Sequence, residues 1–210
     1  REPESAMPSF PFCLSATSGF VHSGVRRSGR TAVLIMAAGL SACSGPQIED
    51  YTSNGPELRI DDYFLGHTRG WGMVQDYSGE VTRRFVVDVI GSMQGNQLIL
   101  EEDFVYANGE TQNRRWTFSP AGDRQWIGRA ADVTGEATAA TRGNALRMNY
   151  VLQVPIDDST WEFSMDDWMY LQPDGRILNR TSMRKLGLEA ASITLAFQRC
   201  PCDSPAPNSK

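Results

Sequence analysis

The sequence predicts an all-β protein, an antiparallel up-and-down meander of about eight to ten strands that closes into a lipocalin-like barrel. Residues 146–154 show the clearest alternation, with apolar side chains on one face and mostly polar side chains on the other. Turn signals such as Asn108-Gly109 and Pro173-Asp174-Gly175 recur at hairpin spacing. A meander of this size favours closure because a closed barrel has no exposed sheet edges.

The elements follow in order along the chain, each a run of β-forming residues bounded by Gly, Asn, Asp or Pro. A short turn is expected before the first strand, at residues 58–64. Where alternation is clear, as at Trp161, Phe163 and Met165, it places one apolar face toward a core. The predicted strands cover residues 70–75, 80–90, 98–106, 114–118, 146–154, 161–165, 177–185 and 193–197.

A targeting signal precedes the predicted barrel. Arg26, Arg27 and Arg30 form a basic start, and residues 32–40 are apolar but too short to span a bilayer. The next residues, Leu40-Ser41-Ala42-Cys43, resemble the lipobox of bacterial lipoproteins, and the resemblance implies that Cys43 is the first mature residue and carries diacylglycerol. An ordinary buried helix with a chance cysteine is the alternative, but such a helix would show polar positions at helical spacing.

The targeting signal sets the expected domain organisation, with Val25 as the start residue. Residues between the signal and the barrel are rich in Gly, Pro, Ser and Asn, as is typical of a tether. Ser44 stands where enteric lipoproteins retained in the inner membrane carry aspartate, which implies the periplasmic face of the outer membrane. The expected regions are mis-annotated upstream translation at 1–24, the lipoprotein signal peptide at 25–42, a lipidated tether at 43–56, the barrel at 57–199 and a flexible tail at 200–210.

The start of the first strand carries a further signal. Residues 66–72 (Gly-His-Thr-Arg-Gly-Trp-Gly) resemble the region that opens lipocalin-type barrels, where a Trp plugs the closed end and a late Arg packs over it. The resemblance implies that Trp71 closes the barrel and that Arg180 or Arg184 is its partner. A plain core Trp is the alternative.

Several segments together resemble an uncharacterised lipoprotein family of Gram-negative bacteria, a domain of unknown function. The resemblance covers residues 58–199 and implies an anchored lipocalin-like domain without assigning a catalytic residue. The segments that carry it are Tyr63-Phe64-Leu65-Gly66, Gly70-Trp71-Gly72, Asp76 with Gly79, Arg83-Arg84-Phe85, and Asn179-Arg180 to Lys185-Leu186-Gly187.

Composition argues against several function classes. The net charge of −5 disfavours nucleic acid, whose phosphates require clustered Lys and Arg. After Cys43 the only histidine is His67, which excludes a His-rich metal site, and no Gly-x-Ser-x-Gly motif accompanies it. Cys200 and Cys202 are too few for a zinc site and are expected to have no catalytic role. We therefore expect neither enzyme activity nor a cofactor.

Acidic residues interrupt the predicted strands at Glu101-Glu102-Asp103, Asp157-Asp158 and Asp166-Asp167. Adjacent strand residues point to opposite faces, so each pair places one carboxylate inward and the other in solvent. Asp88 and Glu102 lie within apolar runs and are candidates for the interior, where a carboxylate requires a partner such as Arg114 or Arg147. Such a pair would contact a ligand headgroup or simply satisfy the core.

The leading functional hypothesis is a membrane-anchored periplasmic lipoprotein whose barrel binds a lipid or fatty acyl ligand, because barrels of this size can enclose one small apolar molecule. The alternatives are a solid core without a ligand, and a non-catalytic envelope accessory protein that presents the barrel surface to a protein partner. The residues expected to line a ligand site are Met148, Tyr150, Leu152, Trp161 and Phe163.

Overall fold

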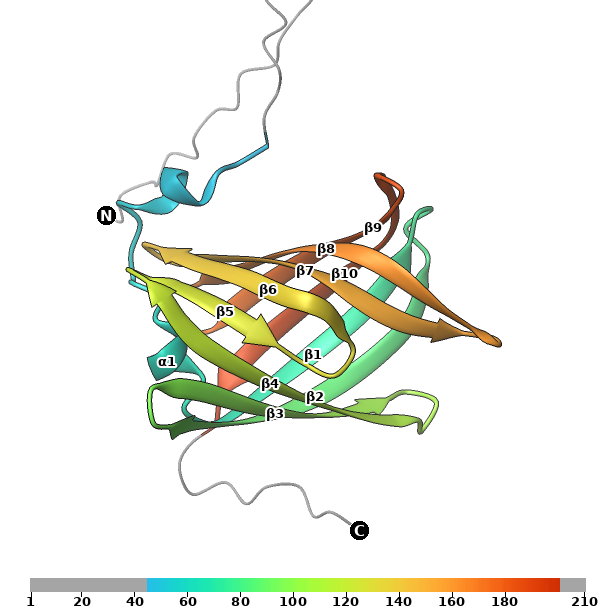
Figure 1. The fold of residues 1–210 in the computed structure, drawn as a ribbon, viewed down its shortest axis with the longest axis horizontal. Helices are drawn as coiled ribbons and strands as arrows, with labels where there is room; N and C mark the ends of the chain where they lie inside the picture. Colours follow the sequence, from blue (N-terminus) through green and yellow to red (C-terminus); the bar gives the residue numbers. More distant parts are fainter. Residues whose placement is uncertain (1–44, 201–210) are drawn as a thin grey trace, which may run out of the picture. The chain divides into compact units, whose positions relative to one another are not determined.

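The structure is a computed structural model that describes residues 45–200. Within them, ten antiparallel strands follow one another around a closed barrel in chain order, and β1 pairs with both β2 and β10 (Figure 1). The predicted fold class is confirmed. Two short helices, η1 (Ile48–Tyr51) and α1 (Ile60–Tyr63), precede the strands. The strands are β1 (Gly66–Asp76), β2 (Val81–Gln94), β3 (Gln97–Tyr106), β4 (Thr111–Gly122), β5 (Gln125–Arg129), β6 (Val133–Arg142), β7 (Ala145–Ile156), β8 (Ser159–Leu171), β9 (Ile177–Lys185) and β10 (Leu188–Arg199).

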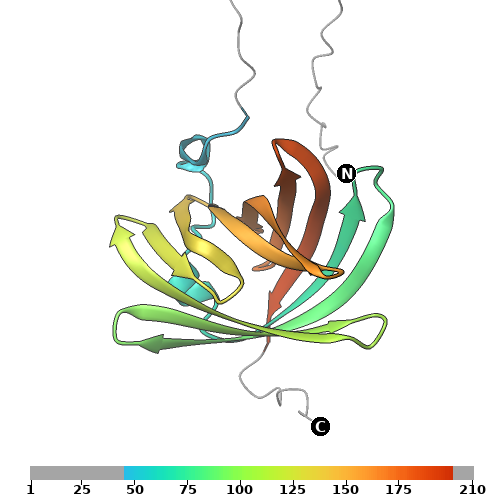
Figure 2. The ribbon, with the colours of Figure 1, turned by 45° about the vertical axis from the view of Figure 1, so that its right-hand side comes forward.

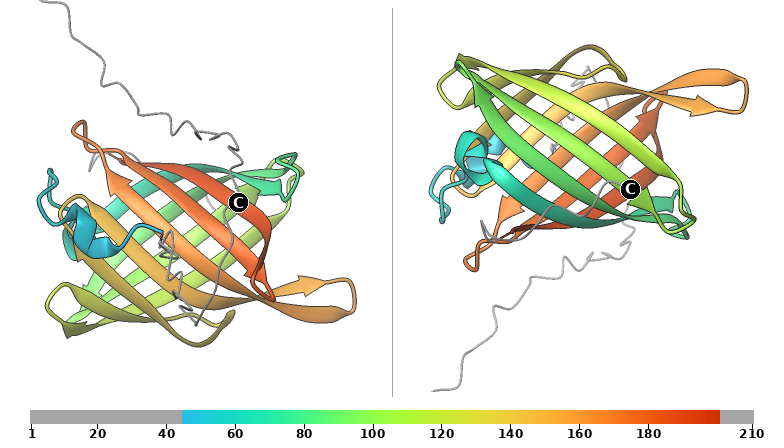
Figure 3. Two further views of the ribbon diagram at one scale, coloured as in Figure 1. Left: turned by 90° about the horizontal axis from the view of Figure 1, so that it is seen from above. Right: turned by 90° about the horizontal axis from the view of Figure 1, so that it is seen from below.

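Strand alternation separates the barrel interior from its outer wall. On β2, for example, Val87 and Val89 are buried, whereas Asp88 and Ile90 face outward. The strands of opposite walls cross one another in Figure 3, as the tilt of a closed barrel requires. The inward apolar residues form one cluster, which includes Phe85, Val87, Val89, Leu98, Leu100, Trp116, Phe118, Ala137, Ala139, Leu146, Met148, Leu152, Phe163, Met165, Ile177 and Phe197.

The turn predicted at residues 58–64 is α1, and it closes one end of the barrel (Figure 1). Ile60, Tyr63 and Phe64 are buried in the interior cluster. The Tyr63 hydroxyl donates a hydrogen bond to the Phe197 carbonyl oxygen at 3.3 Å. We call the end of the barrel that α1 covers the closed end.

The opposite end is the one where β2, β4, β6, β8 and β10 begin (Figure 2). Inward residues near it, among them Phe104, Tyr106, Val154 and Ile193, are only half-buried. We call it the open end.

The N-terminal part of the described chain packs against the outer wall. Ile48 is buried beside Ala145 and Trp168, and the Tyr51 ring lies 5.6 Å from the Trp168 ring and 5.4 Å from the Tyr170 ring. Residues three apart share one side of a 3-10 turn, so Ile48 and Tyr51 cover Trp168 together. The sequence predicts a flexible tether at residues 43–56. In the structure this segment contacts the barrel from Ile48 onward. The predicted upstream region, the signal peptide, Cys43 and Cys202 lie outside the described residues.

Residues 45–200 contain no helix with the length and hydropathy of a membrane-spanning segment.

Candidate functional site

The structure does not place the predicted barrel-closing residues in the interior. Trp71 lies on the outer wall with 47% of its surface exposed. Its neighbours Gly70 and Gly72 point inward, where an added Cβ would meet the Phe197 ring at 2.8 Å and the Phe85 ring at 2.4 Å. Because strand residues alternate, Trp71 must face out. The prediction that Trp71 plugs the barrel is wrong, and α1 has that role.

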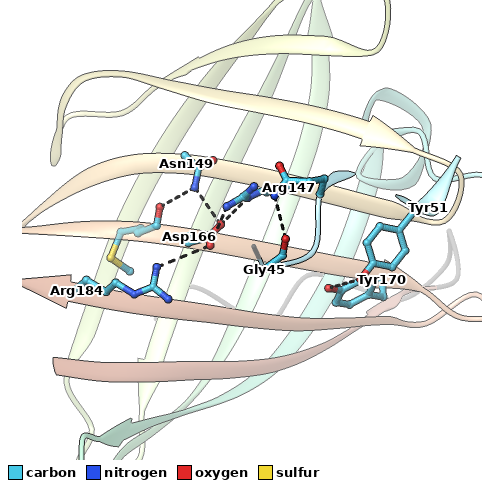
Figure 4. A network of polar contacts seen from close by, with 9 residues as sticks. Gly45, Tyr51, Arg147, Asn149, Asp166, Tyr170 and Arg184 are labelled. Carbon is cyan, nitrogen blue, oxygen red and sulfur yellow. Dashed lines mark hydrogen bonds and ion pairs between the residues drawn. The ribbon is translucent and has the colours of Figure 1, made fainter. Parts of the chain in front are cut away.

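Arg180 and Arg184 also face outward, so neither is the interior partner that was predicted. Arg184 lies 4.0 Å from Asp166 in a network on the outer wall of β7, β8 and β9 (Figure 4). There Arg147 Nε donates to Asp166 Oδ1 at 2.8 Å, and Asn149 Nδ2 donates to the same atom at 3.0 Å. Partial burial raises the pKa of Asp166, but these hydrogen bonds outweigh it and the net pKa is lowered.

Asp88 faces the outer wall too, which corrects its assignment as a candidate for the interior. Its carboxylate accepts hydrogen bonds from Arg69 Nε and Nη2, both at 2.9 Å, and lies 2.6 Å from His67 Nε2. Burial raises the pKa of Asp88, but the bonds from Arg69 and His67 lower it below its ordinary value. His67 is therefore a paired residue of the wall, on the strand that begins at the closed end.

The interior holds a second group of polar residues, centred on Arg114. This residue pairs with Glu102 across the β3–β4 ladder, and Arg114 Nη1 lies 3.7 Å from Glu102 Oε2. Toward β6, Arg114 Nε donates to Asp132 Oδ2 at 2.9 Å and Nη2 lies 2.8 Å from the same oxygen. Burial lowers the pKa of Arg114, but the facing carboxylates raise it overall, so the guanidinium stays charged. Of the two partners considered for an interior carboxylate, Arg114 lies beside Glu102, whereas Arg147 is bonded to Asp166 on the outer wall.

A second interior carboxylate, Asp167, comes from β8. It accepts hydrogen bonds from Asn179 Nδ2 and from Thr181, both on β9. Tyr150 of β7 is buried near both carboxylates, and its ring meets Trp116 edge-on at 5.4 Å. As predicted, each of the acidic runs on β3 and β8 sends one carboxylate inward, because Glu101 and Asp166 face the outer wall.

Burial raises the pKa of both interior carboxyls. Desolvation is the largest influence on Glu102, Arg114 opposes it, and the negative charges of Asp132 and Asp167 add to it, so that the pKa rises to about 7. Desolvation also raises the pKa of Asp167 to about 6, although Asn179 and Thr181 stabilise its ionised form. Both groups therefore titrate near neutral pH.

A cavity of about 50 Å³ lies between Glu102 and α1. Its wall is apolar except for the Glu102 carboxylate, whose side chain keeps 16% of its surface accessible. The cavity wall is formed by Ile60, Phe64, Leu100, Glu102, Trp116, Phe118, Ala139, Leu146, Met148, Met169 and Phe197.

The residues predicted to bind a ligand occupy different depths. Met148 lines the cavity, and Tyr150 stands next to the polar group. Leu152 and Phe163 face each other across the β7–β8 ladder and are buried farther toward the open end. Trp161 lies at the open end, where it is half exposed and stacks on Phe163. These five residues thus share the barrel interior without forming one continuous lining.

Sequence reasoning missed Asp132, Asn179 and Thr181 as members of the polar group. Asn179 and Thr181 alternate with outward Leu178 and Arg180, so the alternation along the strand is enough to identify them as inward residues. Asp132 precedes β6 in a turn, where alternation gives no signal.

No group of three His, Cys, Asp or Glu side chains in the described part of the chain is arranged to hold a metal ion.

The comparisons with known proteins identify the family. The sequence model of a family described as "Protein of unknown function (DUF3833)" matches residues 37–199. The chain belongs to this family. The match spans the entire barrel of this DUF3833 member and confirms its resemblance to an uncharacterised family.

No curated protein matches the chain. Among solved structures, the chain is similar to the S-type phycobiliprotein lyase CPES from Guillardia theta, with 6% identity and a TM-score of 0.49. That similarity covers 74% of this chain and 99% of the lyase.

Proposed function

We propose that the protein binds a lipid-like ligand, a molecule with an alkyl or acyl chain, inside its barrel. The observation that carries this proposal is the apolar cavity beneath α1, whose lining includes one partly buried acidic residue, Glu102. Ligand sites are typically apolar hollows with a few polar groups that fix orientation. The half-buried interior residues at the open end provide the direction of entry, because α1 blocks the other end.

The cavity is smaller than a long alkyl chain, so binding requires side chains to move. Met148 and Met169 line it, and unbranched thioether side chains change rotamer more easily than branched or aromatic ones. We propose that these two methionines adjust to admit the chain of the ligand.

We also propose that a lipid on Cys43 anchors the protein to the periplasmic face of the outer membrane. The chain from Cys43 to Ile48 can span at most about 18 Å. Since Ile48 is packed against Ala145 and Trp168, such an anchor would keep the barrel wall at β7 and β8 near the bilayer. A ligand from that membrane would then have a short path to the barrel.

We propose a non-catalytic role for this binding. The histidine of the described residues, His67, is held by Asp88 on the outer wall, away from the cavity. Arg114 is bonded to Asp132 and Asn179 to Asp167, as in a binding site whose fixed polar groups orient a ligand.

Mass spectrometry of organic extracts tests the proposal. Protein purified from membranes should release a stoichiometric amphipathic molecule, and an apolar fluorescent reporter should bind the delipidated barrel and be displaced by that extract. Binding should weaken when Met148 is replaced by Trp and should persist when the outward Asn149 is replaced by Ala. A barrel that yields no molecule and binds no reporter would contradict the proposal.

A second candidate is an envelope accessory protein that uses its surface. It is favoured by exposed apolar residues at the open end: Leu186 at 94% exposure, Leu188 at 77% and Tyr77 at 85%. These residues lie on the adjacent β9–β10 and β1–β2 hairpins. Replacing Leu186 and Leu188 by Ser would abolish a surface interaction and leave reporter binding intact.

A further inference from the structure

The deep interior of the barrel carries an excess of negative charge. Glu102, Asp132 and Asp167 face it from β3, the turn before β6, and β8, and Arg114 of β4 is the cation that faces them. Tyr150 of β7 and Tyr106 of β3 are the titratable neighbours of Arg114 besides these carboxylates, while β9 contributes the neutral Asn179 and Thr181. Glu102 and Asp132 thus share one guanidinium, and Asp167 adds a third acidic group to the same region.

The walls on the other side add no charge at this depth. β1 and β2 face the interior with Thr68, glycines and Val or Phe residues, and the inward positions of β10 are Ile193, Leu195 and Phe197. Two cations lie at the open end. Arg83 there forms an ion pair with Glu110 at 2.7 Å, and Lys185 donates to the Glu162 carbonyl oxygen at 3.0 Å.

Arg114 does not satisfy all of these carboxylates. Its Nε and Nη2 are engaged with Asp132, and only Nη1 approaches Glu102, at a distance too long for a hydrogen bond. The Glu102 carboxylate accepts no hydrogen bond from any other residue that the structure describes, although it is enclosed by the barrel and lines the cavity. Because this carboxylate keeps only 16% of its side chain accessible and has no donor among the described residues, a ligand that supplies one gains binding energy here.

We propose that the natural ligand is an amphipathic amine, whose positively charged group donates hydrogen bonds to Glu102 while its alkyl chain lies in the apolar cavity. This inference rests on the proposed function and specifies the headgroup of the ligand. An ammonium offers three donors and compensates the excess negative charge, and a charge-assisted hydrogen bond is about twice as strong as a neutral one.

The same charges disfavour an anionic headgroup. A carboxylate beside Glu102 and Asp167 would raise their pKa values and its own, so a fatty acid could enter only with uptake of protons. The site therefore discriminates by repulsion as well as by attraction. Amine and fatty acid of equal chain length should respond to pH in opposite directions.

The affinity for an amine should rise with pH because of the ionisation of Glu102. A primary amine stays protonated across the range from pH 5.5 to 8, so the protein alone determines the pH dependence. As pH rises through the pKa of about 7, Glu102 loses its proton and attracts the ammonium. Asp167, with its lower pKa, adds to this attraction at the acidic end of the range.

The experiment measures displacement of an apolar fluorescent reporter by decylamine and by decanoate at pH 5.5 and pH 8. Decylamine should bind about tenfold more tightly at pH 8, since a favourable interaction of about 1.4 kcal/mol changes affinity tenfold. Decanoate should bind more weakly at pH 8 than at pH 5.5. Glu102→Gln should remove most of the gain for decylamine and improve decanoate binding at pH 8.

Glu101→Gln is the matched control, because Glu101 is the adjacent residue of β3 and pairs with Arg115 on the outer wall. It should leave both affinities and their pH dependence unchanged. Decanoate that binds more tightly than decylamine at pH 8, or a decylamine affinity that Glu102→Gln does not change, would overturn the headgroup assignment while the binding function stands. Failure of the reporter to bind at all would instead contradict the binding function.

Discussion

Arg114 lies directly across the β3–β4 ladder from Glu102, and Arg114 Nη1 lies 3.7 Å from Glu102 Oε2 inside the barrel. The same guanidinium is bonded to Asp132 in the turn before β6. A side chain on β4 thus links β3 to that turn through the interior, which gives the barrel a charged crosslink in place of an entirely apolar core. The following predictions concern this link, the end closed by α1 and the cavity between them.

Arg114→Met should destabilise the barrel strongly. Breaking a buried ion pair by removing one partner typically costs about 3–5 kcal/mol, because the remaining charge is left uncompensated. Urea denaturation at pH 8 measures the loss. The loss of stability should be smaller at pH 5, because Glu102 is protonated in the variant at that pH and leaves no uncompensated charge. Arg115→Met, which removes a half-exposed cation from the outer wall, should cost less than about 1 kcal/mol.

The free energy of unfolding should fall as pH rises from about 4.5 to 7. Burial raises the pKa of Glu102 to about 7 and that of Asp167 to about 6, so the folded protein holds protons that the unfolded chain has already released. Stability is therefore greatest below the unfolded pKa values and declines through the folded ones. The free energy of unfolding of Glu102→Gln, relative to that of the wild type, should increase by about 1–3 kcal/mol when the pH is raised from 5 to 8. Denaturation curves of both proteins at the two pH values give this difference, and a constant difference would contradict the raised pKa.

Alternation made much of this arrangement predictable. It separates Glu102 from Glu101 and Asp167 from Asp166, and it identifies Met148 and Phe163 as inward residues. For Trp71 the alternation and the resemblance to lipocalin-type barrels disagree, and the alternation is right. Gly70 and Gly72 on either side face the interior, where Phe197 and Phe85 leave no space for a larger side chain.

Partners far apart in the sequence were harder to foresee. The apolar run around Asp88 makes it a candidate for the interior, yet outward Val86 and Ile90 belong to the same run. Only the register with Arg69 reveals its partner. Packing of Ile48 on Trp168 joins positions 120 residues apart, and the Gly- and Pro-rich composition around Ile48 gives no indication of it. Such contacts depend on the closed barrel and not on local pattern.

Two tryptophans distinguish the interior from the outer wall. Trp116→Ala should cost about 3–5 kcal/mol, since Trp116 is 3% exposed and borders both the cavity and Tyr150. Trp71→Ala should cost far less, because about half of that side chain is already in solvent. Guanidinium denaturation of the two variants provides the comparison. Equal losses would place Trp71 in the core after all.

Gly91→Ala should loosen the closed end. An added Cβ at Gly91 would lie 1.7 Å from the Phe64 carbonyl oxygen, so the segment that follows α1 would have to move. Overpacking of this kind costs about 1–3 kcal/mol. Amide hydrogen exchange at Tyr63 and Phe64 should accelerate, whereas Ser92→Ala on the outward face of the same strand should leave it unchanged. Unaltered exchange in Gly91→Ala would mean that α1 does not depend on this close contact.

Met148→Trp tests whether the cavity is usable space. Met148 borders the cavity, so an indole at this position can extend into volume that is already empty. We expect a loss of less than about 1 kcal/mol in thermal or chemical unfolding, together with reduced binding of an apolar reporter. Leu98→Trp is the matched control, because Leu98 is fully buried on β3 and does not border the cavity.

In a solid region the inserted ring has no space, and the cost rises to about 1–3 kcal/mol or more. Leu98→Trp should show that larger loss, so the two substitutions calibrate each other within one barrel. If Met148→Trp is as destabilising as Leu98→Trp and the parent protein binds no reporter, the interior is packed throughout. The surface at the open end, with Leu186 and Leu188 exposed, then becomes the better candidate for function. If Met148→Trp instead folds with little loss and excludes the reporter, the cavity beneath α1 is where the alkyl chain binds.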